Sequence, residues 1–299
     1  MNKLFFSGLS VLFIVMLLGC EPLPEQAPGV ENGTTTLNVN GTTRSLNYSV
    51  PEEGAEALII ALHGATDTPE RFEEYSKITD IVNDTKHFGV VYPAGVNGNW
   101  NDGRPELVTK TGDADDVAFI NEIMVHYKAE GYSKFYIVGM SNGGVMAQRM
   151  ACESAAKISG IAVVSATQTT EIANNCNDDI TTIDTLFVFG AQDTIFLSDG
   201  NIAYSSETHI TMPSTRNYWV TRNACSSIRL SKSLDKISDD HTVVDFNDGE
   251  NCRAKFRYID INGGGHRWAD PSATNGSLLL GYASHEISTA KEIITFFGL

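Results

Sequence analysis

The chain has 299 residues, and its 37 acidic and 21 basic side chains give a formal net charge of −16 at pH 7. A surface this negative repels nucleic acid and anionic lipid headgroups, so we expect no nucleic-acid partner and no membrane binding through a basic face. The length is sufficient for one large hydrophobic core, and no second linker follows the first 36 residues. We therefore expect a single folded domain.

The first 20 residues predict an export signal. Lys3 precedes an apolar stretch from Leu4 to Leu18, which is shorter than the roughly 20 apolar residues that span a bilayer. The sequence LLGC at its end resembles a bacterial lipobox, which implies cleavage before Cys20 and acylation of its thiol. We expect a signal peptide at 1–19 and an exported protein, lipid-anchored to a bacterial membrane in the periplasm or at the cell surface. The alternative is an ordinary signal peptide and an extracellular protein.

Residues 20–36 are rich in Pro, Glu, Gly and Thr and contain almost no apolar side chains. Such a composition does not bury enough surface to fold and predicts a flexible tether. We place the folded domain at 37–299.

Short apolar segments after the tether predict a sheet. Residues 35–51 alternate apolar and polar side chains about an Asn-Gly pair, which predicts a hairpin at the edge of the sheet. Six later runs are continuously apolar and end in Gly or Pro turns: 57–64, 89–95, 134–141, 160–166, 185–191 and 255–263. Continuous apolar strands are typical of a parallel sheet that helices cover on both faces.

Helical segments lie between these strands. They are 69–86, 115–130, 143–154 and 284–299. The second has apolar side chains at helical spacing, with Asp115 or Asp116 at its N-terminus. The alternation predicts an α/β fold with a mostly parallel central sheet flanked by helices, whose functional sites lie beyond the C-terminal ends of the strands.

The sequence GMSNG at 139–143 places Ser141 between two glycines, after the apolar run KFYIV and before a helical segment. Strand, turn and helix form the setting of a nucleophile elbow, in which glycines let backbones approach closely and the serine stays exposed at the edge of the sheet. Ser141 is therefore our candidate nucleophile. A tight turn that merely caps a helix is the alternative.

A serine hydroxyl needs a general base and an orienting carboxylate, and in the order Ser, Asp, His both follow Ser141. Asp193 comes directly after the strand 185–191, and His266 follows the strand 255–263 on a glycine-rich loop. The weaker candidates are His209, His241, His285, Asp178, Asp179, Asp184 and Asp199. His241 lies in a polar stretch, His285 opens the last helical segment, and none of these aspartates directly follows an apolar strand.

An acyl-transfer transition state also needs hydrogen-bond donors for a developing oxyanion. The backbone N–H of Asn142, directly after the candidate nucleophile, is one. The sequence LHGAT after the strand 57–64 offers the other from Ala65 or Thr66. We interpret His63 in this sequence as structural rather than as a second base.

Four cysteines remain once Cys20 is assigned to lipid. An even number in an exported chain predicts two disulfides, and three pairings are possible. We favour Cys152–Cys176 and Cys225–Cys252 because these pairs close the shortest loops. Free buried thiols are the alternative.

Five motifs resemble one family, the polyhydroxybutyrate depolymerase-like and feruloyl or acetylxylan esterase-like α/β-hydrolases. They are LHG at 62–64, YPAGVNGNWNDGR at 92–104, DDVAFI at 115–120, GMSNGG at 139–144 and GGGHRW at 263–268. The resemblance implies the α/β-hydrolase fold for the domain at 37–299, with Ser141 as nucleophile, Asp193 as acid and His266 as base. The family has a similar cysteine pattern.

Substrate contacts are less well specified. Trp100, Asn101 and Asp102 could stack on or hydrogen-bond to a substrate, although Asn, Gly and Asp are also ordinary turn residues. Trp219 and Trp268 are further candidates for the wall of the cleft, and a place in the buried core is the alternative for both. The sequence reads Trp-Ala-Asp at 268–270 where the family usually has Trp-Pro-Gly, and the loop after Asp193 lacks the usual proline. Both departures lie in loops that flank the expected cleft.

The sequence as a whole predicts a secreted serine esterase that forms an acyl-enzyme on Ser141 and uses no metal and no organic cofactor. Its substrate would be an ester of a polyester or of a polysaccharide. A peptidase on the same fold is one alternative, because the same three residues also cleave amides. A carbohydrate- or polymer-binding lipoprotein that has lost catalysis is the other.

Overall fold

The protein is described here from a computed structural model, which covers residues 29–176, 181–201, 209–237, 241–274 and 278–299. The expected signal peptide at 1–19 and the expected lipid attachment at Cys20 lie outside these residues. Among the helices of the described residues, none is long and apolar enough to cross a membrane.

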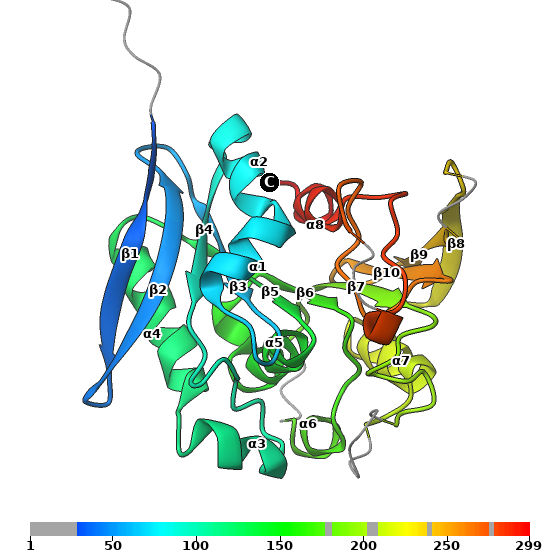
Figure 1. Cartoon of the computed structure of the whole chain (residues 1–299), viewed down its shortest axis with the longest axis horizontal. Helices are drawn as coiled ribbons and strands as arrows, with labels where there is room; N and C mark the ends of the chain where they lie inside the picture. The colour runs from blue at the N-terminus through cyan, green and yellow to red at the C-terminus, as the bar shows by residue number, and fades with distance from the viewer. Residues whose placement is uncertain (1–28, 177–180, 202–208, 238–240, 275–277) are drawn as a thin grey trace, which may run out of the picture.

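A single sheet runs through the molecule in the order β1-β2-β4-β3-β5-β6-β7-β10-β9-β8 (Figure 1). Its strands are β1 (Val30–Val39), β2 (Thr42–Pro51), β3 (Ala57–Leu62), β4 (Phe88–Pro93), β5 (Lys134–Met140), β6 (Gly160–Val164), β7 (Asp184–Gly190), β8 (Ser227–Leu234), β9 (Val243–Glu250) and β10 (Phe256–Asn262). The six neighbouring central strands pair in parallel, in the order β4, β3, β5, β6, β7 and β10. An antiparallel pair flanks them on each side, β1 with β2 and β8 with β9.

Helices cover both faces of this sheet. They are α1 (Pro69–Ser76), α2 (Ile78–Thr85), α3 (Pro105–Thr111), α4 (Asp116–Ala129), α5 (Asn142–Glu153), α6 (Thr170–Asn175), α7 (Met212–Arg222) and α8 (Thr289–Phe297), with short 3-10 turns at Ala155–Lys157 and Leu278–Leu280. Side chains of α4, α5 and α7 belong to one buried cluster, and those of α1, α2 and α8 belong to another.

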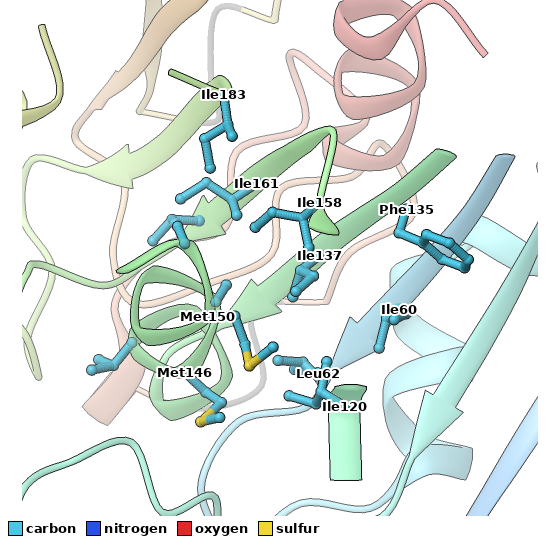
Figure 2. Close-up of a cluster of buried hydrophobic side chains, with 14 of the residues drawn as sticks. Ile60, Leu62, Ile120, Phe135, Ile137, Met146, Met150, Ile158, Ile161 and Ile183 are labelled. Carbon is cyan, nitrogen blue, oxygen red and sulfur yellow. The ribbon is translucent and has the colours of Figure 1, made fainter. Parts of the chain in front are cut away.

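The two clusters arise because successive side chains of a strand point to opposite faces. In β3, Ile60 and Leu62 pack with α4 and α5, whereas Ile59 and Ala61 pack on the other face. Figure 2 shows the first cluster, in which Met146 and other side chains of α5 lie against the strands. The central strands are therefore buried on both sides, as their continuous apolar sequences predicted.

The expected strands and the edge hairpin are confirmed, and three expectations need correction. Strand β1 begins at Val30, so residues 30–36 are not tether but pair with β2. The helix expected at 69–86 is two helices, because Lys77 between them adopts a left-handed conformation with φ of 61°. The last helix begins at Thr289 rather than at 284.

Two disulfides join Cys152 to Cys176 and Cys225 to Cys252, which confirms the favoured pairing. The first links the end of α5 to the residue that follows α6. In the chain-entropy model, each closed loop of this length stabilises the fold by about 3 kcal/mol.

Candidate active site

The candidate nucleophile lies at a sharp turn between β5 and α5. Ser141 has φ of 55° and ψ of −123°, a strained conformation for a residue with a side chain. Its glycine neighbours are required by packing, because a Cβ on Gly139 would collide with the backbone of Gly143, and one on Gly143 with the carbonyls of Leu62 and His63. The half-buried serine therefore stands at the C-terminal end of β5, next to the N-terminus of α5.

His266 and Asp193 form a hydrogen-bonded pair. Nδ1 of His266 lies 3.0 and 2.8 Å from the two carboxylate oxygens of Asp193. The carboxylate also accepts from the backbone N–H groups of Ile195 and Phe196, both at 2.8 Å. Because Nδ1 faces a carboxylate, it carries the proton, and Nε2 is left to accept one.

Backbone contacts between β7 and β10 place this pair. A Cβ on Gly190 would collide with the carbonyls of Gly264 and Gly265, so the loop after β7 and the loop after β10 pack backbone to backbone. The N–H of His266 donates to the carbonyl of Leu280 at 2.7 Å, which fixes the histidine loop on its other side.

Ser141 and His266 border the same cavity of about 770 Å³. No hydrogen bond joins these two residues in the structure. Such bonds are often long in unliganded enzymes and tighten when substrate binds.

The candidate oxyanion donors lie on two loops that meet at this cavity. Ala65, Thr66 and Ser141 all border it, and Asn142 follows Ser141 at the first position of α5. The N–H of Thr66 donates to the carbonyl of Gly98 at 2.7 Å, so Thr66 is not available as a donor. Ala65 and Asn142 therefore remain the candidates for the two backbone oxyanion donors.

Aromatic and charged side chains form the rest of the cavity wall. Trp268 borders it, as the sequence predicted, and packs edge to face on Phe72 and Tyr75. Trp219 does not border it, because its ring is part of the buried cluster under α5 and α7. Besides His266, the ionisable groups at the wall with formal charges are Asp67, Arg71, Glu74, Lys77, Arg267 and Asp270. Burial lowers the pKa of Arg267, whereas it raises the pKa of Tyr75 well above its ordinary value.

The other three residues expected at the substrate do not border this cavity. Trp100 and Asp102 are completely buried, and their partners are protein groups. Asn101 is half-buried; its N–H donates to Asp116 at 2.7 Å and its side chain to the carbonyl of Ala114 at 3.0 Å. Asn101 borders a separate polar depression. The expectation was wrong because the chain after β4 packs beneath the nucleophile rather than over it.

His63 is a structural residue, as expected. Its Nδ1 faces the carbonyl of Gly64 at 2.7 Å, and its Nε2 accepts from the N–H of Gly95 at 3.0 Å. One ring nitrogen must donate and the other accept, so the ring is neutral. Burial lowers the pKa of His63, which favours the same form.

The alternative histidines lie elsewhere. His209 is buried beside Thr167, and its pKa is lowered to about 3 by burial and by the charge of Arg104. His241 is exposed, and His285 contacts the carbonyl of Ala273. Of the alternative aspartates, Asp178 and Asp179 lie outside the described residues, whereas Asp184 and Asp199 do not border the cavity.

Sequence reasoning missed two contributors to the site. Phe196 stacks on the ring of His266 with centroids 5.8 Å apart and planes 8° apart. Tyr75 reaches the cavity from α1. Their positions in the sequence point to the site, because Phe196 lies three residues after Asp193 and α1, which carries Tyr75, directly follows the loop of Ala65.

Solved structures with a similar fold match the chain at low sequence identity. An acetyl xylan esterase from Aspergillus awamori is 15% identical, covers 89% of this chain and 99% of its own, and has a TM-score of 0.58. A cold-adapted esterase from an Arctic intertidal metagenomic library is 13% identical, covers 86% and 92% of the two chains, and has a TM-score of 0.50. The chain has the α/β-hydrolase fold. No protein-family model and no curated protein sequence matches the chain.

The resemblance of the sequence to α/β-hydrolases is thus confirmed for the fold. In an α/β-hydrolase, catalytic groups come from loops at the C-terminal ends of the strands. Ser141, Asp193 and His266 follow β5, β7 and β10 in this way.

Proposed function

We propose that the protein is a serine hydrolase that cleaves carboxylic esters through an acyl-enzyme on Ser141. The observation that carries this proposal is the convergence of three features on one cavity. They are a serine at a strained turn, a histidine whose Nδ1 is held by Asp193, and the loop of Ala65, which carries a candidate oxyanion donor. The α/β-hydrolase fold supports the proposal, because the same arrangement recurs in hydrolases of this fold.

In the proposed reaction, Oγ of Ser141 attacks the ester carbonyl carbon while Nε2 of His266 takes the hydroxyl proton. The N–H groups of Ala65 and Asn142 donate to the oxyanion of the tetrahedral intermediate. Collapse of this intermediate expels the alcohol, which takes the proton back from His266. Water then attacks the acyl group in the same manner and releases the acid, and Asp193 stabilises the imidazolium in both halves.

The cavity wall favours esters with a polar alcohol or acyl group. Charged side chains of both signs stand beside Trp268 and Tyr75, so a sugar or a short hydroxy-acid chain meets both hydrogen-bond partners and aromatic faces. The acetyl xylan esterase of similar fold acts on one such class, and hydroxybutyrate oligomers and methyl ferulate represent the others.

A small ester panel tests the function. We would compare the chain from residue 29 onward with its Ser141→Ala variant on p-nitrophenyl acetate and butyrate, methyl ferulate, acetylated xylan and hydroxybutyrate oligomers. We expect turnover of at least one ester by the parent and a loss of about 10⁴-fold or more in the variant. Equal rates in the two proteins, or hydrolysis of peptides alone, would contradict the proposal.

We propose further that the domain is exported and held to a membrane by acyl chains on Cys20, a proposal that the lipobox-like LLGC supports. Bacteria that express the full chain should label it with radioactive palmitate. The Cys20→Ser variant should take up no label and leave the membrane fraction. Equal labelling of both proteins would count against Cys20 as the lipid site.

A further inference from the structure

The segment 99–104, which the proposed reaction does not use, connects the two loops that carry the oxyanion donors. The indole Nε1 of Trp100 donates to the carbonyl of His63 at 2.9 Å, on the loop that leads to Ala65. The backbone of Trp100 forms a two-way pair with the side chain of Asn142. Its N–H donates to Oδ1 at 2.8 Å, and its carbonyl accepts from Nδ2 at 3.1 Å.

A buried ion pair is hydrogen-bonded to this connection between the two loops. Nδ2 of Asn142 also donates to Asp102 at 2.7 Å, and Asp102 pairs with Arg104 at 2.6 Å. Asn142, Asp102 and Trp100 are at most 1% exposed. Hydrogen bonds in such dry surroundings hold their geometry more strongly than those in water.

The geometry matters because the two donors belong to loops that are distant in the chain. Ala65 follows β3 and Asn142 follows β5, so no short stretch of backbone sets the distance between their N–H groups. Trp100 contacts both loops through separate atoms. Displacing a catalytic group by about 1 Å can lower the rate about 100-fold.

We propose that Trp100, Asp102 and the side chain of Asn142 are positioning residues that set the separation of the two oxyanion donors. This inference rests on the proposed esterase function. The three side chains do not touch the substrate; they act through the backbone N–H groups of Ala65 and Asn142. The role accounts for the burial of Trp100 and Asp102 beneath Ser141.

Two single variants and their combination test the inference. Asn142→Ala removes the side-chain bonds and keeps the backbone N–H. Trp100→Phe keeps an aromatic ring and the backbone pair with Asn142 but removes the Nε1 donor together with part of the buried ring, so it tests the second contact if Asn142→Ala folds poorly. We expect kcat to fall 10- to 100-fold in each, with KM within about twofold of the parent. The double variant should lose about as much as the worse single one, because both act through one connection.

Asn101→Ala is a matched control from the same segment. It removes the side-chain hydrogen bonds with the carbonyl of Ala114 and with Arg149, and neither of these residues lies on an oxyanion loop. We expect its kcat and KM to remain within about twofold of the parent.

A spectroscopic measurement separates positioning from a general loss of stability. An acyl-enzyme formed from a slowly deacylating cinnamoyl ester with a ¹³C-labelled carbonyl reports the hydrogen bonds to that carbonyl. We expect its infrared stretching frequency to be higher in Trp100→Phe and Asn142→Ala than in the parent or Asn101→Ala. Unchanged kcat and an unchanged frequency, with only a lower melting temperature, would overturn the inference and leave the esterase proposal intact. A parent that Ser141→Ala does not impair would instead remove the esterase proposal and this inference with it.

Discussion

Two Trp-x-Asp sequences in this protein have opposite surroundings. At 100–102, Nε1 of Trp100 donates to a backbone carbonyl, and Asp102 pairs with Arg104 and Asn142. At 268–270, Trp268 borders the cavity, and its Nε1 has no hydrogen-bond partner among the described residues. The sequences look alike, yet the first packs beneath Ser141 and the second borders the cavity. Residue type alone therefore does not identify a substrate-binding residue.

The difference follows from the elements that precede each sequence. The segment 99–104 follows β4 and is covered by the nucleophile turn, because Trp100 bonds to residues after β3 and β5. The loop of Trp268 follows β10 and includes His266, the proposed general base. In an α/β sheet, ligands bind beyond the C-terminal ends of the strands, whereas a segment that packs between the loops is buried.

The largest expected contrast is in stability. Asp102→Ala removes the buried ion pair with Arg104 and the hydrogen bond from Asn142, so we expect it to lower the free energy of unfolding by about 3–5 kcal/mol. Asp270→Ala removes only a local turn in which the carboxylate accepts from the N–H and hydroxyl of Ser272, and it should cost about 1 kcal/mol. Urea unfolding of both variants measures this difference. Equal losses would show that the two aspartates are equivalent.

A smaller contrast concerns two histidines on either side of Phe196, whose ring packs on both His266 and His209. His266 borders the cavity, whereas His209 is closed off and has a pKa lowered to about 3 by burial and by Arg104. Between pH 6.5 and 3 the unfolded chain binds a proton at His209 that the folded chain does not, so stability falls as the pH is lowered through this window. At pH 5 the loss should be on the order of 2 kcal/mol.

Urea unfolding at pH 7 and pH 5 measures this effect in the parent and in His209→Gln. Glutamine keeps a hydrogen-bond partner for Thr167 but does not titrate. The variant should therefore lose less stability than the parent between the two pH values. The same pH dependence in both proteins would contradict a neutral buried His209.

Sequence reasoning succeeded where a local pattern decides the structure. Continuous apolar runs located the central strands, and the glycines around Ser141 predicted a turn that the structure explains by backbone contact. Asp193 and His266 could be chosen because each directly follows a strand, and the structure brings them together.

Other features depend on contacts that no local pattern encodes. The hairpin of β8 and β9 was not predicted, because β8 is largely exposed and lacks an apolar run. The choice between Ala65 and Thr66 depended on a hydrogen bond to Gly98, more than 30 residues away in the chain. The break at Lys77 was hidden within one continuous helical pattern.

The strained backbone conformation at Ser141 lowers the stability of the fold, whereas the proposed activity requires a serine there. A φ of 55° is strained for a serine but not for a glycine. The residue that relieves the strain at this position is therefore glycine, which has no hydroxyl. Directed evolution that selects heat resistance alone would therefore favour replacement of the proposed nucleophile. A screen for more stable variants of this protein must therefore measure turnover in every round, because selection for stability alone would also retain inactive variants.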